Sequence, residues 1–265
     1  MLSAVSAGPT LLLGLDFSCA PSQRKPLTLA WGRRAGHAIK LDRVDALPTL
    51  AELEALLAPG YPPLAEGFVM ACDFPFGLPM PFVDALRVHG PGELPALLAD
   101  LDDPAKGQAA DRLIQALHRH CGNRAGFQQL IDTWGQSWHM DRPPGSKLLH
   151  RPTDQAAPGV SSTSPLQTRY VPVGKMYFEG MARLIQADLT LPGLRHGRAQ
   201  AVAFEAYPGL LAHELLGRRS YKSETDATDE RLIARMDLVD ALEQGRSRLG
   251  LRLKLSPAQR DWLVS

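Results

Sequence analysis

The amino-acid sequence predicts an α/β fold in which helices cover one mixed β-sheet. Three short apolar runs have the length of buried strands, and each ends at an acidic residue followed by turn-forming residues. Between these runs lie stretches whose apolar residues recur every three or four positions, as in amphipathic helices. With 265 residues, 45% of them hydrophobic, the chain can bury a large core, and we expect one domain over residues 1–265.

Three strands are expected at the beginning of the chain. Residues 10–16 form the first apolar run, which ends at Asp16. Residues 27–33 and 37–44 are two further candidates, joined by the short Gly-containing segment Arg34-Ala35-Gly36. A link of this kind is typical of a hairpin, so the opening strands should be antiparallel.

A helix and a second core strand follow. Thr49 can cap a helix over residues 49–58, and Glu52 is placed to complete a capping box. Residues 68–72 are a continuous apolar run, as expected of a strand that is buried on both faces. Asp73 closes this run, so a second acid ends a second predicted core strand.

The middle of the chain predicts an insertion over residues 81–172. Its first part has helical periodicity, including a long amphipathic stretch over residues 104–120. Its second part, residues 140–172, contains six prolines and a Ser-Ser-Thr-Ser run, which is typical of a loop. We therefore expect helices followed by a long irregular segment.

The last third of the chain returns to regular structure. A helix is predicted over residues 175–187, followed by a strand over residues 200–204 that ends at Glu205. Another helix is expected over residues 229–246, and Ser256 before Pro257 is typical of the first turn of a final short helix. A third acid thus ends a third predicted core strand.

This order of elements is that of the RNase H-like fold, a five-stranded mixed sheet with flanking helices. In that fold the first, fourth and fifth strands lie side by side and parallel, so Asp16, Asp73 and Glu205 should converge at one edge of the sheet. Such a group suits Mg²⁺ or Mn²⁺, and two ions roughly 3.5–4 Å apart can drive phosphodiester hydrolysis. Each acid alone has an ordinary alternative, because Asp often ends strands by accepting hydrogen bonds from the following turn.

Four motifs resemble those of domain-of-unknown-function family 429, whose members are predicted RNase H-like nucleases. The motifs are Gly14-Leu15-Asp16-Phe17-Ser18, Asp73-Phe74-Pro75-Phe76-Gly77-Leu78-Pro79, Pro172-Val173-Gly174-Lys175-Met176 and Phe204-Glu205-Ala206-Tyr207-Pro208-Gly209. The resemblance spans nearly the whole chain. It implies a metal-dependent nuclease whose acidic positions are Asp16, Asp73 and Glu205. The family pattern continues into a helix with a further acidic motif, which this sequence lacks; Asp261 is the only acid near its end.

Basic residues gather around the predicted loop. Residues 142–175 carry five Lys or Arg against one Asp, whereas residues 49–103 carry nine Asp or Glu against one Arg. Flexible cations of this kind can contact a phosphate backbone or a nucleotide. The predicted substrate-binding residues are Lys147, Arg151, Lys175, Tyr221 and Lys222.

Composition limits the location and the kind of partner. The net charge of +1 gives no global attraction to nucleic acid or to an anionic membrane, so any such binding must be local. The three cysteines, Cys19, Cys72 and Cys121, form no C-x-x-C pair, which favours a reducing compartment. The first residues lack the basic region of a signal peptide, and the apolar run there is too short for a membrane span. We expect a cytoplasmic protein with no membrane partner.

The leading functional hypothesis is a metal-dependent nuclease, and two alternatives remain. A nucleotide phosphotransferase or phosphatase would also use acids at strand ends and a metal ion, although the sequence has no Gly-rich phosphate loop. A non-catalytic nucleic-acid-binding or scaffold protein on the same fold is the other alternative. Metal binding discriminates between this last class and the two enzymes.

Overall fold

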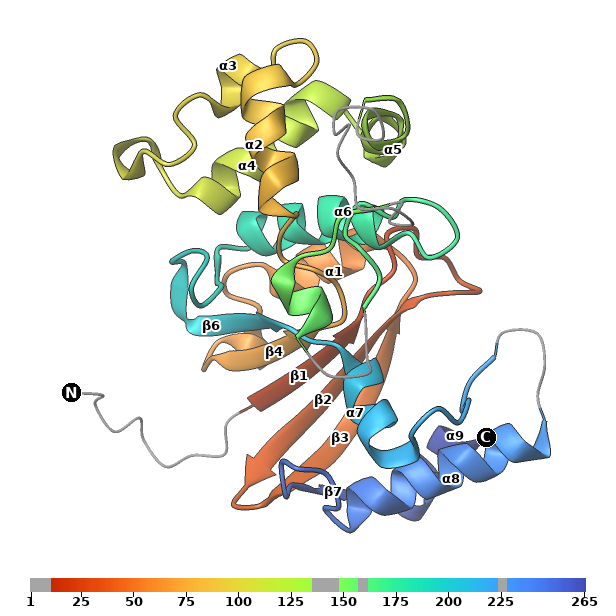
Figure 1. Cartoon of the computed structure of the whole chain (residues 1–265). Helices are drawn as coiled ribbons and strands as arrows, with labels where there is room; N and C mark the ends of the chain where they lie inside the picture. Colours follow the sequence, from red (N-terminus) through yellow and green to blue (C-terminus); the bar gives the residue numbers. More distant parts are fainter. Residues whose placement is uncertain (1–10, 135–147, 157–161, 224–227) are drawn as a thin grey trace.

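A computed structural model describes residues 11–134, 148–156, 162–223 and 228–265, in which one mixed seven-stranded sheet is flanked by helices (Figure 1). The predicted α/β class is confirmed. Across the sheet the strand order is β5-β6-β4-β1-β2-β3-β7. The strands are β1 (Leu11–Asp16), β2 (Leu27–Ala35), β3 (Ala38–Leu47), β4 (Phe68–Cys72), β5 (Leu189–Thr190), β6 (Arg198–Glu205) and β7 (Arg252–Lys254).

The strand directions divide the sheet into two halves. β1 pairs antiparallel with β2, and β2 pairs antiparallel with β3, as the sequence predicted. β1 is parallel to β4, and β4 is parallel to β6, so these three strands end at the same edge. The expected count of five strands was too low, because β5 and β7 add one short strand at each side. With two and three residues, they are too short to show an alternating pattern in the sequence.

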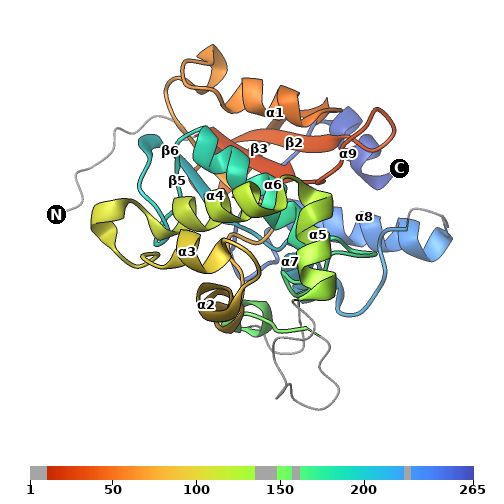
Figure 2. The same ribbon diagram turned by 90° about the horizontal axis from the view of Figure 1, so that it is seen from above.

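Helices form two groups around the sheet. The helical cluster of α2 to α5 lies at one end of the molecule, and α6 lies between this cluster and the sheet (Figures 1 and 2). α7, α8, α9 and β7 form a second group beside β3. The helices are α1 (Leu50–Leu57), α2 (Met80–His89), α3 (Leu94–Leu98), α4 (Ala109–Cys121), α5 (Arg124–Thr133), α6 (Val173–Gln186), α7 (Pro208–Leu216), α8 (Asp229–Glu243) and α9 (Pro257–Val264), with short 3₁₀ turns at Pro62–Leu64, Pro104–Lys106 and Pro152–Gln155.

Local sequence signals explain where several helices begin and end. The Thr49 hydroxyl accepts a hydrogen bond from the Glu52 backbone N–H and caps α1. Ser256 and Gln259 form a complete capping box at the start of α9. The predicted long helix over residues 104–120 was wrong in its first turn. Gly107 has a φ of 106°, which α-helix geometry does not allow, and α4 begins only after it.

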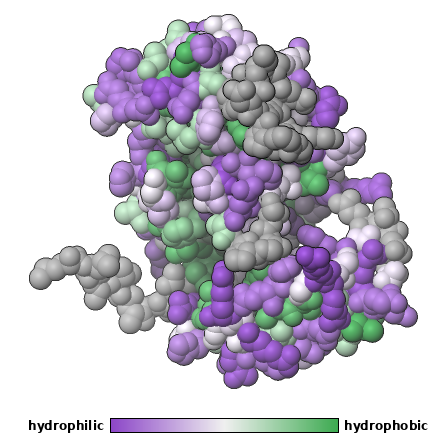
Figure 3. Space-filling view, viewed as in Figure 1, coloured by the Kyte–Doolittle hydropathy of each residue, from purple (hydrophilic) through white to green (hydrophobic). Residues whose placement is uncertain are grey.

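The core lies on one face of the sheet. Alternate residues of the central strands are buried there, including Leu13, Leu15, Met70 and Cys72, and they join side chains from α1, α4, α5 and α6 in one hydrophobic cluster. The other face is more open: the Phe204 side chain is 47% exposed. Apolar surface is visible over β4 and β6 in Figure 3. Within the described ranges, no helix has the length and hydropathy that a membrane span requires.

Candidate functional site

Two of the predicted acids lie side by side at the shared edge of the parallel strands. Asp16 is the last residue of β1, and Asp73 follows the last residue of β4. Leu15 pairs with Cys72 in the parallel register, and the Asp73 backbone N–H donates to the Leu15 carbonyl oxygen at 2.9 Å. Asp16 and Asp73 therefore occupy neighbouring positions, from which paired residues point to the same face of the sheet.

Neither of these two carboxylates is in direct contact with a cation in the described part of the chain. Within the described residues, Asp16 and Asp73 make no side-chain hydrogen bond and no salt bridge. Burial, and after it the nearby Asp16, raise the pKa of Asp73 to about 6, and Lys222 opposes this shift. Two adjacent carboxylates that repel each other are the donor set that a hard divalent cation fits.

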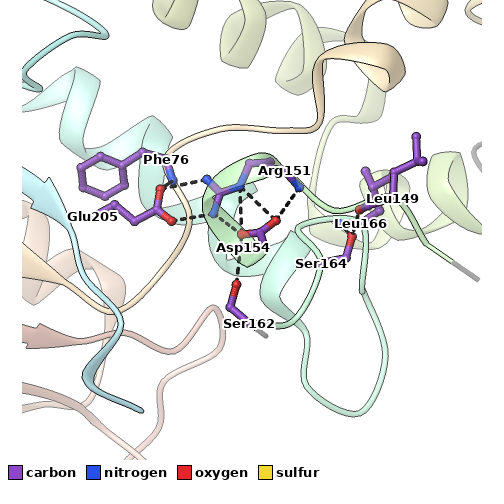
Figure 4. Close-up of polar contacts among 8 residues, drawn as sticks. All are labelled: Phe76, Leu149, Arg151, Asp154, Ser162, Ser164, Leu166 and Glu205. Atoms are coloured by element: carbon purple, nitrogen blue, oxygen red, sulfur yellow. Dashed lines mark hydrogen bonds and ion pairs between the residues drawn. The ribbon is translucent and has the colours of Figure 1, made fainter. Parts of the chain in front are cut away.

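Glu205 reaches the same edge but has other partners. It pairs with Cys72 in the register of β4 and β6, one position before Asp73. Glu205 is therefore offset by one position from the Asp16–Asp73 pair, although Asp73 and Glu205 both line one pocket. Its Oε2 atom accepts the Phe76 backbone N–H at 2.8 Å (Figure 4). In the parts of the chain that are described, no three His, Cys, Asp or Glu side chains are grouped closely enough to hold a metal ion.

A guanidinium group holds Glu205 in place. Arg151 donates to both carboxylate oxygens of Glu205, at 2.8 and 2.5 Å, and to Asp154 through Nε and Nη2 (Figure 4). Ser162 donates a further hydrogen bond to Asp154 at 3.0 Å. We call these four residues the Arg151 network.

Burial differs within the Arg151 network, from a half-exposed Glu205 to a buried Asp154. Asp154 is only 3% exposed. Burial acts to raise the pKa of Asp154, but the hydrogen bonds from Arg151 outweigh it and hold that pKa below its usual value. Burial likewise opposes the charge on Arg151, yet the hydrogen bonds to Glu205 and Asp154 leave the pKa of Arg151 raised. The network thus fixes the segment around residue 151 to the end of β6.

The remaining predicted substrate-binding residues have different positions. Lys222 is close enough to Asp73 to lower the pKa of that carboxyl group. The Lys222 ammonium lies 5.8 Å from the ring centroid of Tyr221, which is partly buried. Lys175 lies in the first turn of α6, where its charge acts on Cys19 and Asp132. Lys147 lies outside the described residues.

A pocket of about 620 Å³ opens next to Asp73 and Glu205. Its lining comes from the segments after β4 and β6 and from the starts of α6 and α7. The Arg151 network and residues next to it in the sequence also line the pocket. Sequence analysis did not single out Asp154, Tyr207 or the lining residues of α6 and α7. The only sequence signal for Tyr207 was its place in the motif that follows β6.

Two glycines make room for aromatic side chains at this edge. A Cβ atom on Gly180 would come within 2.5 Å of the Phe74 ring, so glycine allows the residue after Asp73 to pack against α6. A Cβ atom on Gly209 would come within 2.9 Å of the Tyr207 ring. The Tyr207 ring therefore packs against the backbone of Gly209, in the first turn of α7.

Other potentially reactive side chains lie in different environments. Cys19 is buried, and burial is the largest cause that raises the pKa of its thiol, so it lacks the thiolate character of a nucleophile. His118 stacks on Phe178, with ring centroids 3.8 Å apart, and its Nε2 lies 2.9 Å from the Phe178 carbonyl oxygen. Asp261 is exposed on α9, where neighbouring Gln259 contacts β3.

In comparisons with known proteins, no family model, no curated protein and no solved structure matches this chain. The resemblance to family 429 and the cytoplasmic location remain predictions from the sequence. Any function has to be derived from the geometry and chemistry of the site.

Proposed function

We propose that this protein is a divalent-metal-dependent nuclease of the RNase H-like fold. The strand order supports the fold assignment. β3, β2, β1, β4 and β6 are adjacent in that order, the first three are antiparallel neighbours, and β1, β4 and β6 are parallel. This is the arrangement expected for the five core strands, to which β5 and β7 are additions.

The paired carboxylates of Asp16 and Asp73 carry the proposal. Apolar strands lead up to both, and a pair of like charges at such a position is unfavourable unless a cation is present. Asp16 and Asp73 would hold Mg²⁺ or Mn²⁺ through their carboxylate oxygens. A bound ion would supply activation of a water molecule and stabilisation of the leaving oxygen in phosphodiester hydrolysis.

The cations near this edge fit an anionic substrate. Lys222 acts on Asp73 from the segment after α7, and Lys175, in the first turn of α6, acts on Cys19, which is three residues after Asp16. These lysines would attract and orient a phosphate group, because ammonium groups interact with phosphate as point charges. Because the net charge of +1 gives no global attraction to an anion, these two lysines are the main electrostatic support for substrate binding.

One observation favours a non-catalytic binding protein as the second candidate. Glu205, the third predicted metal ligand, is bound to Arg151 instead. A site with two carboxylates holds a single ion more readily than the two-ion centre of the leading proposal. In this second candidate, Lys222 and Lys175 would help the fold to bind nucleic acid without cleaving it.

Two measurements on the wild-type protein test the proposal. Millimolar Mn²⁺ or Mg²⁺ should raise the melting temperature, since a ligand at about 100 times its Kd stabilises the folded state by about 2.7 kcal/mol. The same ions should support hydrolysis of bis(p-nitrophenyl) phosphate, and EDTA should abolish it. Stabilisation without hydrolysis would favour the non-catalytic candidate, and absence of both effects would refute the metal site.

A further inference from the structure

The pocket beside the paired carboxylates has the character of a site for an uncharged, flat group. Its volume of about 620 Å³ is in the range of small-molecule sites. Val173, Met176, Leu210 and Tyr207 contribute apolar surface, and the hydroxyls of Thr153 and Thr163 also line it. The pocket therefore combines apolar walls with a few groups that can form hydrogen bonds.

The cations in this pocket are already engaged. Arg151 donates through Nε, Nη1 and Nη2 to the carboxylates of Glu205 and Asp154. Arg248, the other described cation in the lining, lies 3.5 Å from Glu214. A phosphate group inside the pocket would thus have to compete with internal carboxylates for both guanidinium groups, whereas a neutral ring would not.

Tyr207 gives the pocket an aromatic surface. Its side chain is 45% exposed, although a tyrosine has a large apolar ring. The ring rests against the backbone of Gly209 and lies two residues after Glu205, at the end of β6. An exposed aromatic ring in the lining of a pocket can stack with a nucleobase.

We propose that this pocket binds one unpaired nucleoside of a single-stranded nucleic acid, with its base against Tyr207. This inference rests on the proposed nuclease function, and it names the substrate class of the same site. Asp73 lines the pocket, so a phosphate at the paired carboxylates would have its attached nucleoside within reach of the pocket. A base inside a duplex is stacked and paired, and it would have to leave the helix to enter.

Binding can be tested without catalysis, using the oligonucleotide dT5 in the presence of EDTA. Wild-type protein should bind dT5 more tightly than the same sequence in a duplex. Tyr207→Ala should weaken dT5 binding by about tenfold, because base–aromatic stacking is lost, while Tyr207→Phe should retain it. Leu210→Trp should also weaken binding by filling the pocket. Trp262→Ala is the control, because it removes an exposed aromatic ring on α9.

The outcomes separate this inference from the proposed function. Melting temperatures of all variants show that each one is folded. Equal dT5 affinity in wild type and Tyr207→Ala, or equal affinity for single strand and duplex, would overturn the inference. Metal-dependent hydrolysis of bis(p-nitrophenyl) phosphate tests the paired carboxylates independently. Tyr207-dependent dT5 binding in a protein without that hydrolysis would support the pocket and refute the nuclease.

Discussion

Two pairs of carboxylates at the same edge of the sheet have opposite environments. Asp16 and Asp73 lie next to each other, and in the described structure neither forms a salt bridge or a side-chain hydrogen bond. Glu205 and Asp154 share the guanidinium group of Arg151. The first pair repels and is open to an external cation, whereas the second pair has a permanent internal one. Acids at equivalent strand ends therefore have different partners within the chain.

Neutralising one acid of the Asp16–Asp73 pair should have the largest effect on activity. Asp73→Asn keeps the shape of the side chain but removes the charge that would hold a cation, so Mg²⁺-dependent cleavage should fall at least about 100-fold. Initial rates on single-stranded DNA and RNA measure this, together with the stabilisation by Mn²⁺, which should disappear. Asp84→Asn on α2, where the carboxylate is mostly exposed, is the control and should leave both unchanged. Retention of metal-dependent cleavage by Asp73→Asn would show that the metal lies elsewhere.

Removing the internal cation should mainly affect folding. Arg151→Met leaves the buried Asp154 carboxylate without its ion pair, and we expect a loss of about 3 kcal/mol in the free energy of unfolding. Urea unfolding measures this loss. Adding Asp154→Asn to Arg151→Met should recover part of it, because the unpaired charge is then gone. A loss below about 0.5 kcal/mol would mean that the Arg151 network contributes no more than a surface ion pair.

The pH dependence of stability should distinguish the two pairs without any metal. The folded-state pKa of Asp73 is raised to about 6, above its ordinary value of 3.8, so the folded state retains the proton longer than the unfolded state. The contribution of Asp73 to the free energy of unfolding is therefore fully present below about pH 4 and is lost as the pH rises through about 6.

Comparison of wild type with Asp73→Asn in EDTA isolates this contribution. The variant should be more stable by about 1 kcal/mol at pH 7 to 8, a value reduced for partial solvent exposure, and the difference should vanish near pH 4. Urea unfolding at a series of pH values measures it. A variant that is less stable than wild type at pH 8 would show that Asp73 has a partner that stabilises its charge.

Lys222, whose charge acts on Asp73, should have the smallest effect of these changes. Lys222→Gln removes one charge that can contact phosphate, so oligonucleotide affinity should fall a few-fold and the salt dependence of log K should weaken by about one unit. Lys254→Gln on β7, at the far side of the sheet, is the matched control. Affinity for dT5 as a function of salt concentration measures both. An unchanged salt slope for Lys222→Gln would remove Lys222 from the proposed substrate-binding residues.

The strands and their terminal acids could be predicted because the signals are local. An apolar run that stops at an acid before a turn indicates both the end of a strand and a candidate site residue, as at Asp16 and Asp73. Three strands, β1, β4 and β6, follow from such runs, and β2 and β3 follow from the hairpin pattern. β5 and β7 could not be predicted, since two- and three-residue strands exist only through pairing with their neighbours.

The sequence by itself determined the α/β class, the helix caps and the three acids that end core strands. Only the tertiary structure decided which partners each acid has there. Arg151 is 54 positions from Glu205 in the chain. No local sequence pattern predicts that a guanidinium group contacts this acid and not Asp16 or Asp73. Register adds a second reason: Glu205 pairs with Cys72 and not with Asp73, and this offset depends on how β4 and β6 pair rather than on either segment alone.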